Sequence, residues 1–126
     1  MLDILCIGDS KIDIYLQIPD NNSHFGLNET RDKLFLSYGE KIVVDRYVLD
    51  VGGNATNAAI GLSRLGITSG LCAEIGKDEL SAKILDKLKS EKVNTDFLIQ
   101  NDKEQTSISI ALNYKQDRSL LFIVLN

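Results

Sequence analysis

Residues 50–66 decide the fold of this chain, and they read DVGGNATNAAIGLSRLG. An apolar run ends at two glycines, and residues at helical spacing follow directly. Asn54 stands at the expected N-cap, where a side-chain oxygen accepts from the free amides of the first turn. Gly66 stands at the C′ position, where glycine adopts the left-handed conformation at little cost. The spacing places one apolar stripe on the predicted helix, formed by Ala55, Ala58, Ala59, Leu62 and Leu65. The stretch therefore predicts a strand, a tight glycine turn and a helix of about three turns.

This glycine turn has the properties of a ligand site, although a structural role explains the same residues. The amides at a helix N-terminus attract anions and polar ligand oxygens, because the helix dipole lies behind them. Gly52 and Gly53 have no Cβ, so a ligand can approach the backbone closely. Asn54 and Asn57 lie three residues apart on one side of the first turn, and their amides both donate and accept. From the residues alone, a site for a polyhydroxylated ligand and a purely structural turn both remain open.

The order Gly-Gly-Asn-x-x-Asn-x-Ala-x-x-Leu-x-x-Leu-Gly resembles the first signature of the ribokinase family, the PfkB-type carbohydrate kinases. Every position of it is matched, by Gly52, Gly53, Asn54, Asn57, Ala59, Leu62, Leu65 and Gly66. The resemblance implies an α/β fold: a ribokinase-like, Rossmann-type parallel sheet flanked by helices, with a small inserted β-sheet lid over residues 15–50. It also implies phosphorylation of a sugar or nucleoside hydroxyl with ATP and Mg²⁺ as cofactors. The glycines and asparagines of the signature would then hold the substrate hydroxyls.

Asp13 is a second candidate for substrate binding. The apolar residues 4–7 predict a buried first strand that closes at Gly8, and alternation from residue 12 to 18 predicts a half-buried strand after it. Asp13 therefore lies near the carboxyl end of the first strand, where open α/β sheets bind ligands. An ordinary solvent-facing carboxylate is the alternative. In the resemblance, an Asp at this distance from the glycine hydrogen-bonds the sugar hydroxyls.

Lys11 departs from the family pattern, because many sugar kinases of the family carry Asn at this position. This difference puts the identity of the sugar in doubt. It favours a substrate that already carries a phosphate, unless Lys11 points into solvent. Thr106 is a further candidate by resemblance, because the family has a threonine before the strand that borders the substrate pocket.

The rest of the chain predicts further strands and one more helix. Residues 20–32 predict a loop, and two strands at 34–37 and 42–49 flank a turn at Tyr38-Gly39. In the resemblance these strands form the lid, which implies a homodimer through the lid. A strand at 68–75 precedes a helix that Asp78 caps and whose apolar face is formed by Leu80, Ile84, Leu85 and Leu88.

A short strand at 97–99 and an antiparallel hairpin of 106–113 with 120–125 complete the predicted elements. The alternation of strands and helices with short links predicts βαβ units and a largely parallel sheet.

Composition excludes several classes of protein. A chain of 126 residues fits one domain over 1–126, and 44% hydrophobic with 25% charged residues fits a folded chain. A net charge of −4 without a basic patch argues against nucleic acid as the partner. No apolar run reaches the ~20 residues of a membrane span, and no signal peptide opens the sequence, so we expect a cytoplasmic protein. Cys6 and Cys72 lie in apolar runs and predict reduced core thiols; with the single His24, they argue against a Cys/His metal site.

No catalytic residue is predicted in this chain. It ends directly after an apolar strand, so we expect a truncated sequence. The family's second signature, Asp-Thr-x-Gly-Ala-Gly-Asp with its catalytic aspartate, has no match here, and neither P-loop nor GxGxxG occurs. The chain would thus supply the substrate-binding half of a kinase and be inactive alone. The alternatives are a non-catalytic sugar- or nucleoside-binding fragment and a generic nucleotide-binding Rossmann-like domain.

Overall fold

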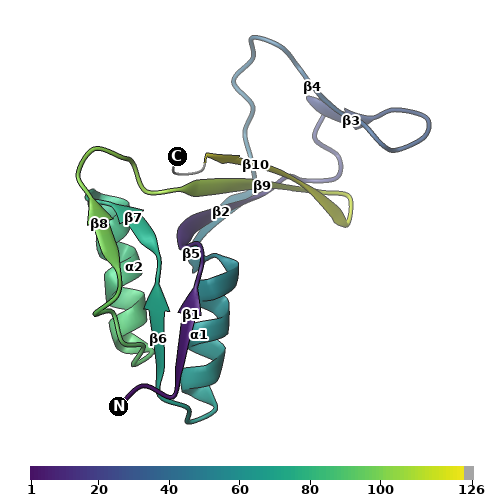
Figure 1. Cartoon of the computed structure of the whole chain (residues 1–126). Coiled ribbons are helices and arrows are strands. Elements are labelled where there is room, and N and C mark those ends of the chain that lie inside the picture. The colour runs from purple at the N-terminus through teal and green to yellow at the C-terminus, as the bar shows by residue number, and fades with distance from the viewer. Residues whose placement is uncertain (124–126) are drawn as a thin grey trace.

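The computed structural model describes residues 1–123, which form two helices and ten strands (Figure 1). In its helical part the strands pair in parallel: β1 (Ile4–Ile7) with β6 (Ser69–Cys72), and β7 (Glu74–Gly76) with β8 (Ile99–Asn101). Both helices pack behind these strands in the view of Figure 1, as α1 (Asn54–Arg64) and α2 (Glu79–Ser90). Because a helix joins each parallel pair, the predicted βαβ units are confirmed.

A four-stranded mixed sheet crosses above this part of the molecule in Figure 1. Its order is β10 (Asp117–Ile123), β9 (Ile108–Tyr114), β2 (Lys11–Gln17) and β5 (Arg46–Gly52). The central strand β2 runs parallel to β9 and antiparallel to β5. A small hairpin of β3 (Phe25–Leu27) and β4 (Leu34–Leu36) lies at the far end. The predicted hairpin of β9 and β10 is confirmed over the described residues, while its predicted end at residues 124 and 125 lies outside them.

The two helices bury their apolar faces in one core. Ala59 of α1 and Ile84 and Leu88 of α2 are fully buried there, together with Leu71 and Ile75 of the strands. Burial of one such aliphatic side chain contributes about 1.5–3 kcal/mol, so this core holds the helices on the strands. No helix among residues 1–123 is long and apolar enough to cross a bilayer.

The start of α2 and the end of α1 have the caps that the sequence predicts. Asp78 caps α2 with a capping box: its carboxylate accepts from the Ser81 amide at 2.9 Å, and the Ser81 hydroxyl accepts from the Asp78 amide at 3.0 Å. At the end of α1, the Gly66 amide donates to Ser63 O at 2.9 Å and the Ile67 amide to Leu62 O at 3.0 Å. This is a Schellman motif with Gly66 at a φ of +85°. The cap of α2 and the C′ glycine of α1 are thus confirmed.

The predicted N-cap of α1 is wrong. Gly53 is the N-cap, and Asn54 is already the first helical residue, so its side chain makes no cap hydrogen bond within the described chain. The apolar stripe is also rotated: Ala58 and Leu65 are exposed, whereas Thr56 and Ile60 are buried. The reason is that α1 leans on β1 and β6, and these strands cover the Thr56–Ile60 side.

The lid region differs from the prediction in its pairing. Residues 20–32 contain the strand β3, and β4 pairs with it instead of pairing across Tyr38-Gly39. The Asn28 side chain makes the real turn, because its Oδ1 accepts from the amides of Asp32 and Lys33 at 3.0 and 2.9 Å. The next strand begins at Arg46 instead of residue 42. The sequence identifies Asn28 as a residue typical of turns, but it does not show which backbone amides donate to the Asn28 side chain.

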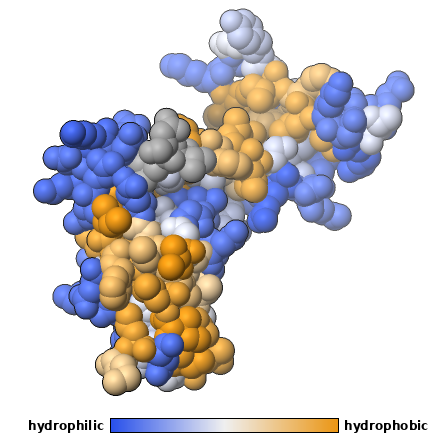
Figure 2. Space-filling view, viewed as in Figure 1, coloured by the Kyte–Doolittle hydropathy of each residue, from blue (hydrophilic) through white to orange (hydrophobic). Residues whose placement is uncertain are grey.

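Two other predictions need correction. The strand predicted at 68–75 is divided between β6 and β7 at Ala73, and the strand predicted at 97–99 begins only at Ile99. The first strand is not buried: Ile7 is 75% exposed, because α1 packs on one side of β1 and only β6 pairs with β1 among the described residues. Figure 2 shows hydrophobic side chains gathered over these strands. Cys6 and Cys72 are free thiols here and are only partly buried.

Candidate functional site

Polar side chains gather on one face of the four-stranded sheet, around Asp13. Alternation along β2 places Lys11, Asp13 and Tyr15 on this face and the intervening isoleucines on the other. The strand register brings Gly52 of β5 opposite Lys11, and Ser109 of β9 alongside Asp13. Three of the predicted site residues, Lys11, Asp13 and Gly52, are therefore brought together from two strands.

Neighbouring side chains hold the Asp13 carboxylate. The Ser109 hydroxyl donates to Oδ1, and Lys11 Nζ lies 3.9 Å from the same oxygen. The Tyr15 hydroxyl donates to Oδ2 over 3.5 Å. Burial and the Asp13 charge raise the pKa of Tyr15, so the phenol stays protonated and remains a donor. The Asp13 side chain is 16% exposed, which leaves it accessible from the open side of the sheet.

Ser109 was not among the predicted site residues. The only signal in the sequence is its place in the predicted strand 106–113, where it alternates with isoleucines as a small polar residue. Ser109 lies 96 positions from Asp13 in the chain, and only the parallel pairing of β2 with β9 makes them neighbours. The pairing of these two strands was not part of the prediction.

The two glycines of the turn are required for different reasons. A Cβ at Gly52 would lie 1.9 Å from Asp13 Oδ2, so a side chain there would displace the carboxylate. Gly53 adopts a φ of +107°, and a Cβ there would lie 2.5 Å from the Asp9 carbonyl oxygen. Only glycine tolerates both conditions at position 53. Gly52 thus belongs to the Asp13 cluster, while Gly53 allows the chain to pass the β1–β2 connection.

A carboxylate of the chain itself already occupies the N-terminus of α1. Asp9 Oδ1 accepts from the Asn54 amide at 2.9 Å, and the Asp9 carbonyl accepts from the Thr56 hydroxyl at 3.0 Å. A negative charge at this end is stabilised by the helix dipole, and it repels a second anion. The site is therefore ill suited to a phosphate, which argues against the Rossmann-like nucleotide alternative. The side chains of Asn54 and Asn57 remain exposed beside it.

Thr106 is hydrogen-bonded away from the Asp13 cluster. Its amide donates to Asp78 Oδ2 at 2.8 Å and its hydroxyl to Oδ1 at 2.7 Å. Burial raises the pKa of Asp78, but hydrogen bonds from Thr106 and Ser81 outweigh it and the net pKa is lower than usual. Thr106 therefore ties the segment before β9 to the start of α2, and the structure does not bring its hydroxyl to Asp13.

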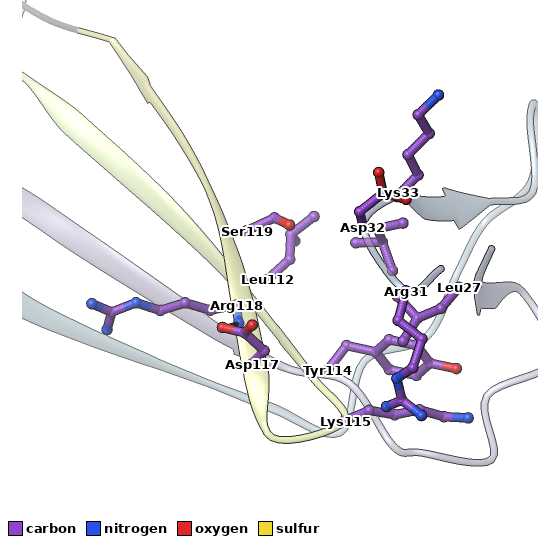
Figure 3. A pocket seen from close by; sticks show the side chains of 11 residues that line it. Leu27, Arg31, Asp32, Lys33, Leu112, Tyr114, Lys115, Asp117, Arg118 and Ser119 are labelled. Carbon is purple, nitrogen blue, oxygen red and sulfur yellow. Dashed lines mark hydrogen bonds between the residues drawn. The ribbon is translucent and has the colours of Figure 1, made fainter. Parts of the chain in front are cut away.

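A separate cleft of about 390 Å³ lies between the β3–β4 hairpin and the β9–β10 turn (Figure 3). Arg31 and Lys115 point to the same side of it beside Tyr114, while Arg118 and Lys33 point away from them. Lys115 Nζ lies 5.5 Å from the centre of the Tyr114 ring. None of the predicted site residues lines this cleft.

Comparison with known proteins gives one consistent family. The profile described as pfkB family carbohydrate kinase matches residues 1–124. The fructosamine kinase FrlD of Bacillus subtilis is 34% identical over 86 residues, which are 66% of this chain and 30% of that protein. The fructokinase of Escherichia coli is 36% identical over 74 residues, which are 58% of this chain and 24% of that protein.

Solved structures show the same fold. The fructokinase of Halothermothrix orenii superposes with a TM-score of 0.72 at 25% identity, over 96% of this chain and 37% of that one. The nucleoside kinase of Methanocaldococcus jannaschii gives a TM-score of 0.76 at 22% identity, over 98% and 37%. The chain thus has the ribokinase-like α/β fold and spans about a third of the length of these structures. Because the family profile extends over nearly every residue, this chain belongs to the pfkB family of carbohydrate kinases.

Proposed function

We propose that this chain supplies the substrate-binding part of a kinase that transfers a phosphoryl group from ATP to a hydroxyl of a sugar or nucleoside. The observation that supports it best is the Asp13 carboxylate, which accepts a hydrogen bond from Ser109 and is partly accessible on its face of the sheet. An ionised carboxylate accepts from hydroxyl donors and forms stronger hydrogen bonds than a neutral acceptor. A polyhydroxylated substrate is the ligand that such a group matches.

Each predicted residue has a proposed role in that site. Asp13 Oδ2 accepts from one substrate hydroxyl beside the backbone of Gly52 and Gly53. The exposed side-chain amides of Asn54 and Asn57 bind further hydroxyls. These residues contribute by orienting the substrate. Placing the attacking oxygen in line lowers the activation barrier of phosphoryl transfer by several kcal/mol, and by about 7–11 kcal/mol in the best case.

Lys11 and Thr106 have more restricted roles. Lys11 Nζ lies 3.9 Å from Asp13 Oδ1 and 5.5 Å from the centre of the Phe122 ring, so its positive charge interacts with both the carboxylate and the ring. We propose that it donates to a neutral substrate oxygen, because the carboxylates of Asp9, Asp13 and Asp50 lie in the same region and disfavour a phosphorylated substrate. Thr106 lies at the border of the proposed site, where its hydrogen bonds to Asp78 position the segment before β9.

ATP and Mg²⁺ are proposed as cofactors from the family. A sugar kinase of Pyrococcus horikoshii, which superposes with a TM-score of 0.69, has been solved in complex with ATP. The residues described here do not fit a nucleotide, because the N-terminus of α1 is occupied by Asp9. We therefore place the nucleotide site and the catalytic base in the family's remaining segments and assign no chemical step to residues 1–123.

The wider assignments follow from the same proposal. We propose a single cytoplasmic domain over residues 1–126 that includes the lid at about 15–50. We further propose a homodimer through the lid, supported by apolar side chains that are exposed within residues 15–50. Phe35, Leu36 and Tyr47 are 54–70% exposed. Analytical ultracentrifugation of wild type and Tyr47→Asp would test this contact.

The test of the function is a substrate screen with the polypeptide of the complete reading frame that contains residues 1–126. Thermal stabilisation and ADP release are measured with sugars, nucleosides and phosphorylated sugars. We expect both signals with a neutral sugar or nucleoside, and Asp13→Ala should lower kcat/KM by well over tenfold, or more than ~1.4 kcal/mol. The exposed carboxylate variant Asp117→Ala serves as the control.

The outcomes separate the alternatives. Stabilisation by a sugar without ADP release would indicate the non-catalytic binding protein. Stabilisation by nucleotides alone, with no effect of any sugar, would support the Rossmann-like nucleotide domain and contradict the proposal.

A further inference from the structure

Ser109 is the closest donor to the carboxylate that we assign to substrate binding. We propose that Ser109 is a positioning residue, whose hydroxyl fixes the Asp13 side chain in one rotamer and so presents Oδ2 to the substrate. This inference rests on the proposed function for its consequence in binding, whereas the fixing of Asp13 can be measured without any substrate.

The hydrogen bond has the setting that positioning requires. Ser109 is only 3% exposed, so water competes little for its hydroxyl, and its Oγ donates to Asp13 Oδ1. The parallel register of β2 and β9 places the two residues side by side on the same face. Both strands are held over six paired positions, so the donor itself is rigid.

The other neighbours of Asp13 hold it less firmly. Lys11 Nζ is 3.9 Å from Oδ1, beyond hydrogen-bonding distance, and it stands on a flexible four-carbon stem. The Tyr15 hydroxyl is 3.5 Å from Oδ2, at the limit of a hydrogen bond. Within residues 1–123, Ser109 is thus the only side chain that makes a short contact with the carboxylate.

Gly52 completes the arrangement from the other side. The strands β9 and β5 flank β2, so the carboxylate lies between the Ser109 hydroxyl and the bare backbone of Gly52. Ser109 and Lys11 both approach Oδ1, whereas Oδ2 receives only the long contact from Tyr15, so Oδ2 is the oxygen with more capacity left for a substrate hydroxyl. Without the Ser109 hydroxyl only the long contacts remain, and rotation about χ1 of Asp13 becomes possible.

The first test measures the Asp13 rotamer in solution. Three-bond couplings from the backbone N and carbonyl carbon to Cγ of Asp13 report the χ1 populations in the polypeptide of the complete reading frame. We expect one rotamer in wild type and averaged couplings in Ser109→Ala, with recovery in Ser109→Thr, which keeps the hydroxyl. A single unchanged rotamer in Ser109→Ala would overturn the inference.

A matched control lies next to the site. Ser10 is 1% exposed, and its hydroxyl has no hydrogen-bond partner among the described residues. Ser10→Ala therefore removes an equally buried hydroxyl and should leave the Asp13 couplings unchanged. If Ser109→Ala does not fold, Ser109→Cys decides, because a thiol is nearly the same shape but a weak donor. Partial averaging in that variant supports the inference, and wild-type couplings contradict it.

The second test links position to binding in the polypeptide of the complete reading frame. Ser109→Ala should raise KM about tenfold, the equivalent of one hydrogen bond to a charged group, with the melting temperature little changed and with recovery in Ser109→Thr. In the Asp13→Ala background the same change should have no further effect, because the carboxylate that it positions is gone. An equal rise in KM in that background would indicate a merely structural role.

The two proposals fail separately. If wild type releases no ADP with any substrate, the kinase proposal fails, and the couplings still decide whether Ser109 fixes Asp13. If wild type is active and Ser109→Ala has the wild-type KM, only the positioning role fails.

Discussion

The two helices of this chain begin in different ways, although each closely follows a strand. Helix α2 carries its own cap, because Asp78 and Ser81 exchange hydrogen bonds within one turn. Helix α1 begins at Gly53, and the carboxylate at its N-terminus comes from Asp9, 45 positions earlier in the chain. The carboxylate at the N-terminus of α1 thus comes from a distant residue, whereas the carboxylate at the N-terminus of α2 belongs to its own cap residue.

This difference explains which side chains are available for a ligand. In α2 the polar residues of the first turn are engaged, since Asp78 also accepts two hydrogen bonds from Thr106. In α1 the cap comes from outside, so the side chains of Asn54 and Asn57 are not needed for it and stay exposed. A binding site can be built at the start of α1 without weakening the helix.

The largest expected effect comes from a substitution at Gly53, whose conformation brings the start of α1 next to Asp9. Gly53→Ala places a Cβ 2.5 Å from the Asp9 carbonyl oxygen at a φ of +107°, so the turn and the Asp9 contacts must both shift. We expect a loss of at least about 3 kcal/mol in the free energy of unfolding, measured with urea.

Gly61 provides the matched control for this change. It lies inside α1, and a Cβ there would meet nothing within 4 Å. Gly61→Ala should therefore stabilise the protein by up to about 1 kcal/mol, through helix propensity. Similar losses at both positions would contradict the special role of Gly53.

The local cap of α2 should give the next largest effect. Asp78→Ala removes the cap and leaves the buried Thr106 hydroxyl without its acceptor, at a cost of about 2 kcal/mol at neutral pH. The pKa of Asp78 is lower in the folded state than its usual 3.8, so its carboxylate stabilises the fold above that value. This stabilisation is lost as the pH falls through the folded pKa.

Urea unfolding at several pH values measures this dependence. The difference between wild type and Asp78→Ala should be constant from pH 7 to about pH 5 and shrink below about pH 4. Thr106→Val, which keeps the shape but not the hydroxyl donor, should lose part of the same stability. A difference that stays constant down to pH 2 would show that the carboxylate's charge has no part in the cap.

The contrast between the two helix ends also shows what could be predicted from sequence. The cap of α2 and the C′ glycine of α1 were predicted correctly, because all of their partners lie within a few residues. The cap of α1 was predicted wrongly, because Asn54 has the right chemistry but lies one position inside the helix, and the sequence does not show that Asp9 accepts from the Asn54 amide.

The candidate site follows the same division. Asp13, Lys11 and Gly52 were identified by their chemistry and by resemblance, and the strand register brings them together. Ser109 and Asp9 were not identified, since each acts on a residue 45 or more positions away, through strand pairing or loop packing. Long-range partners of this kind depend on the whole fold, which one sequence does not specify by spacing.

The smallest expected effect concerns Asn54, and it tests the comparison most directly. A side-chain cap would cost about 1 kcal/mol when replaced by alanine, whereas an exposed first-turn residue costs no more than about 0.5 kcal/mol. Because Asp9 occupies the amide, we expect the smaller value for Asn54→Ala and about 1 kcal/mol for Asp9→Ala, both from urea unfolding. If Asn54 instead binds substrate, its alanine variant should keep the wild-type stability and still lose affinity for the sugar or nucleoside. The reverse order of the two stabilities would mean that Asn54 caps α1 in solution, and its amide would then be no longer free for a ligand.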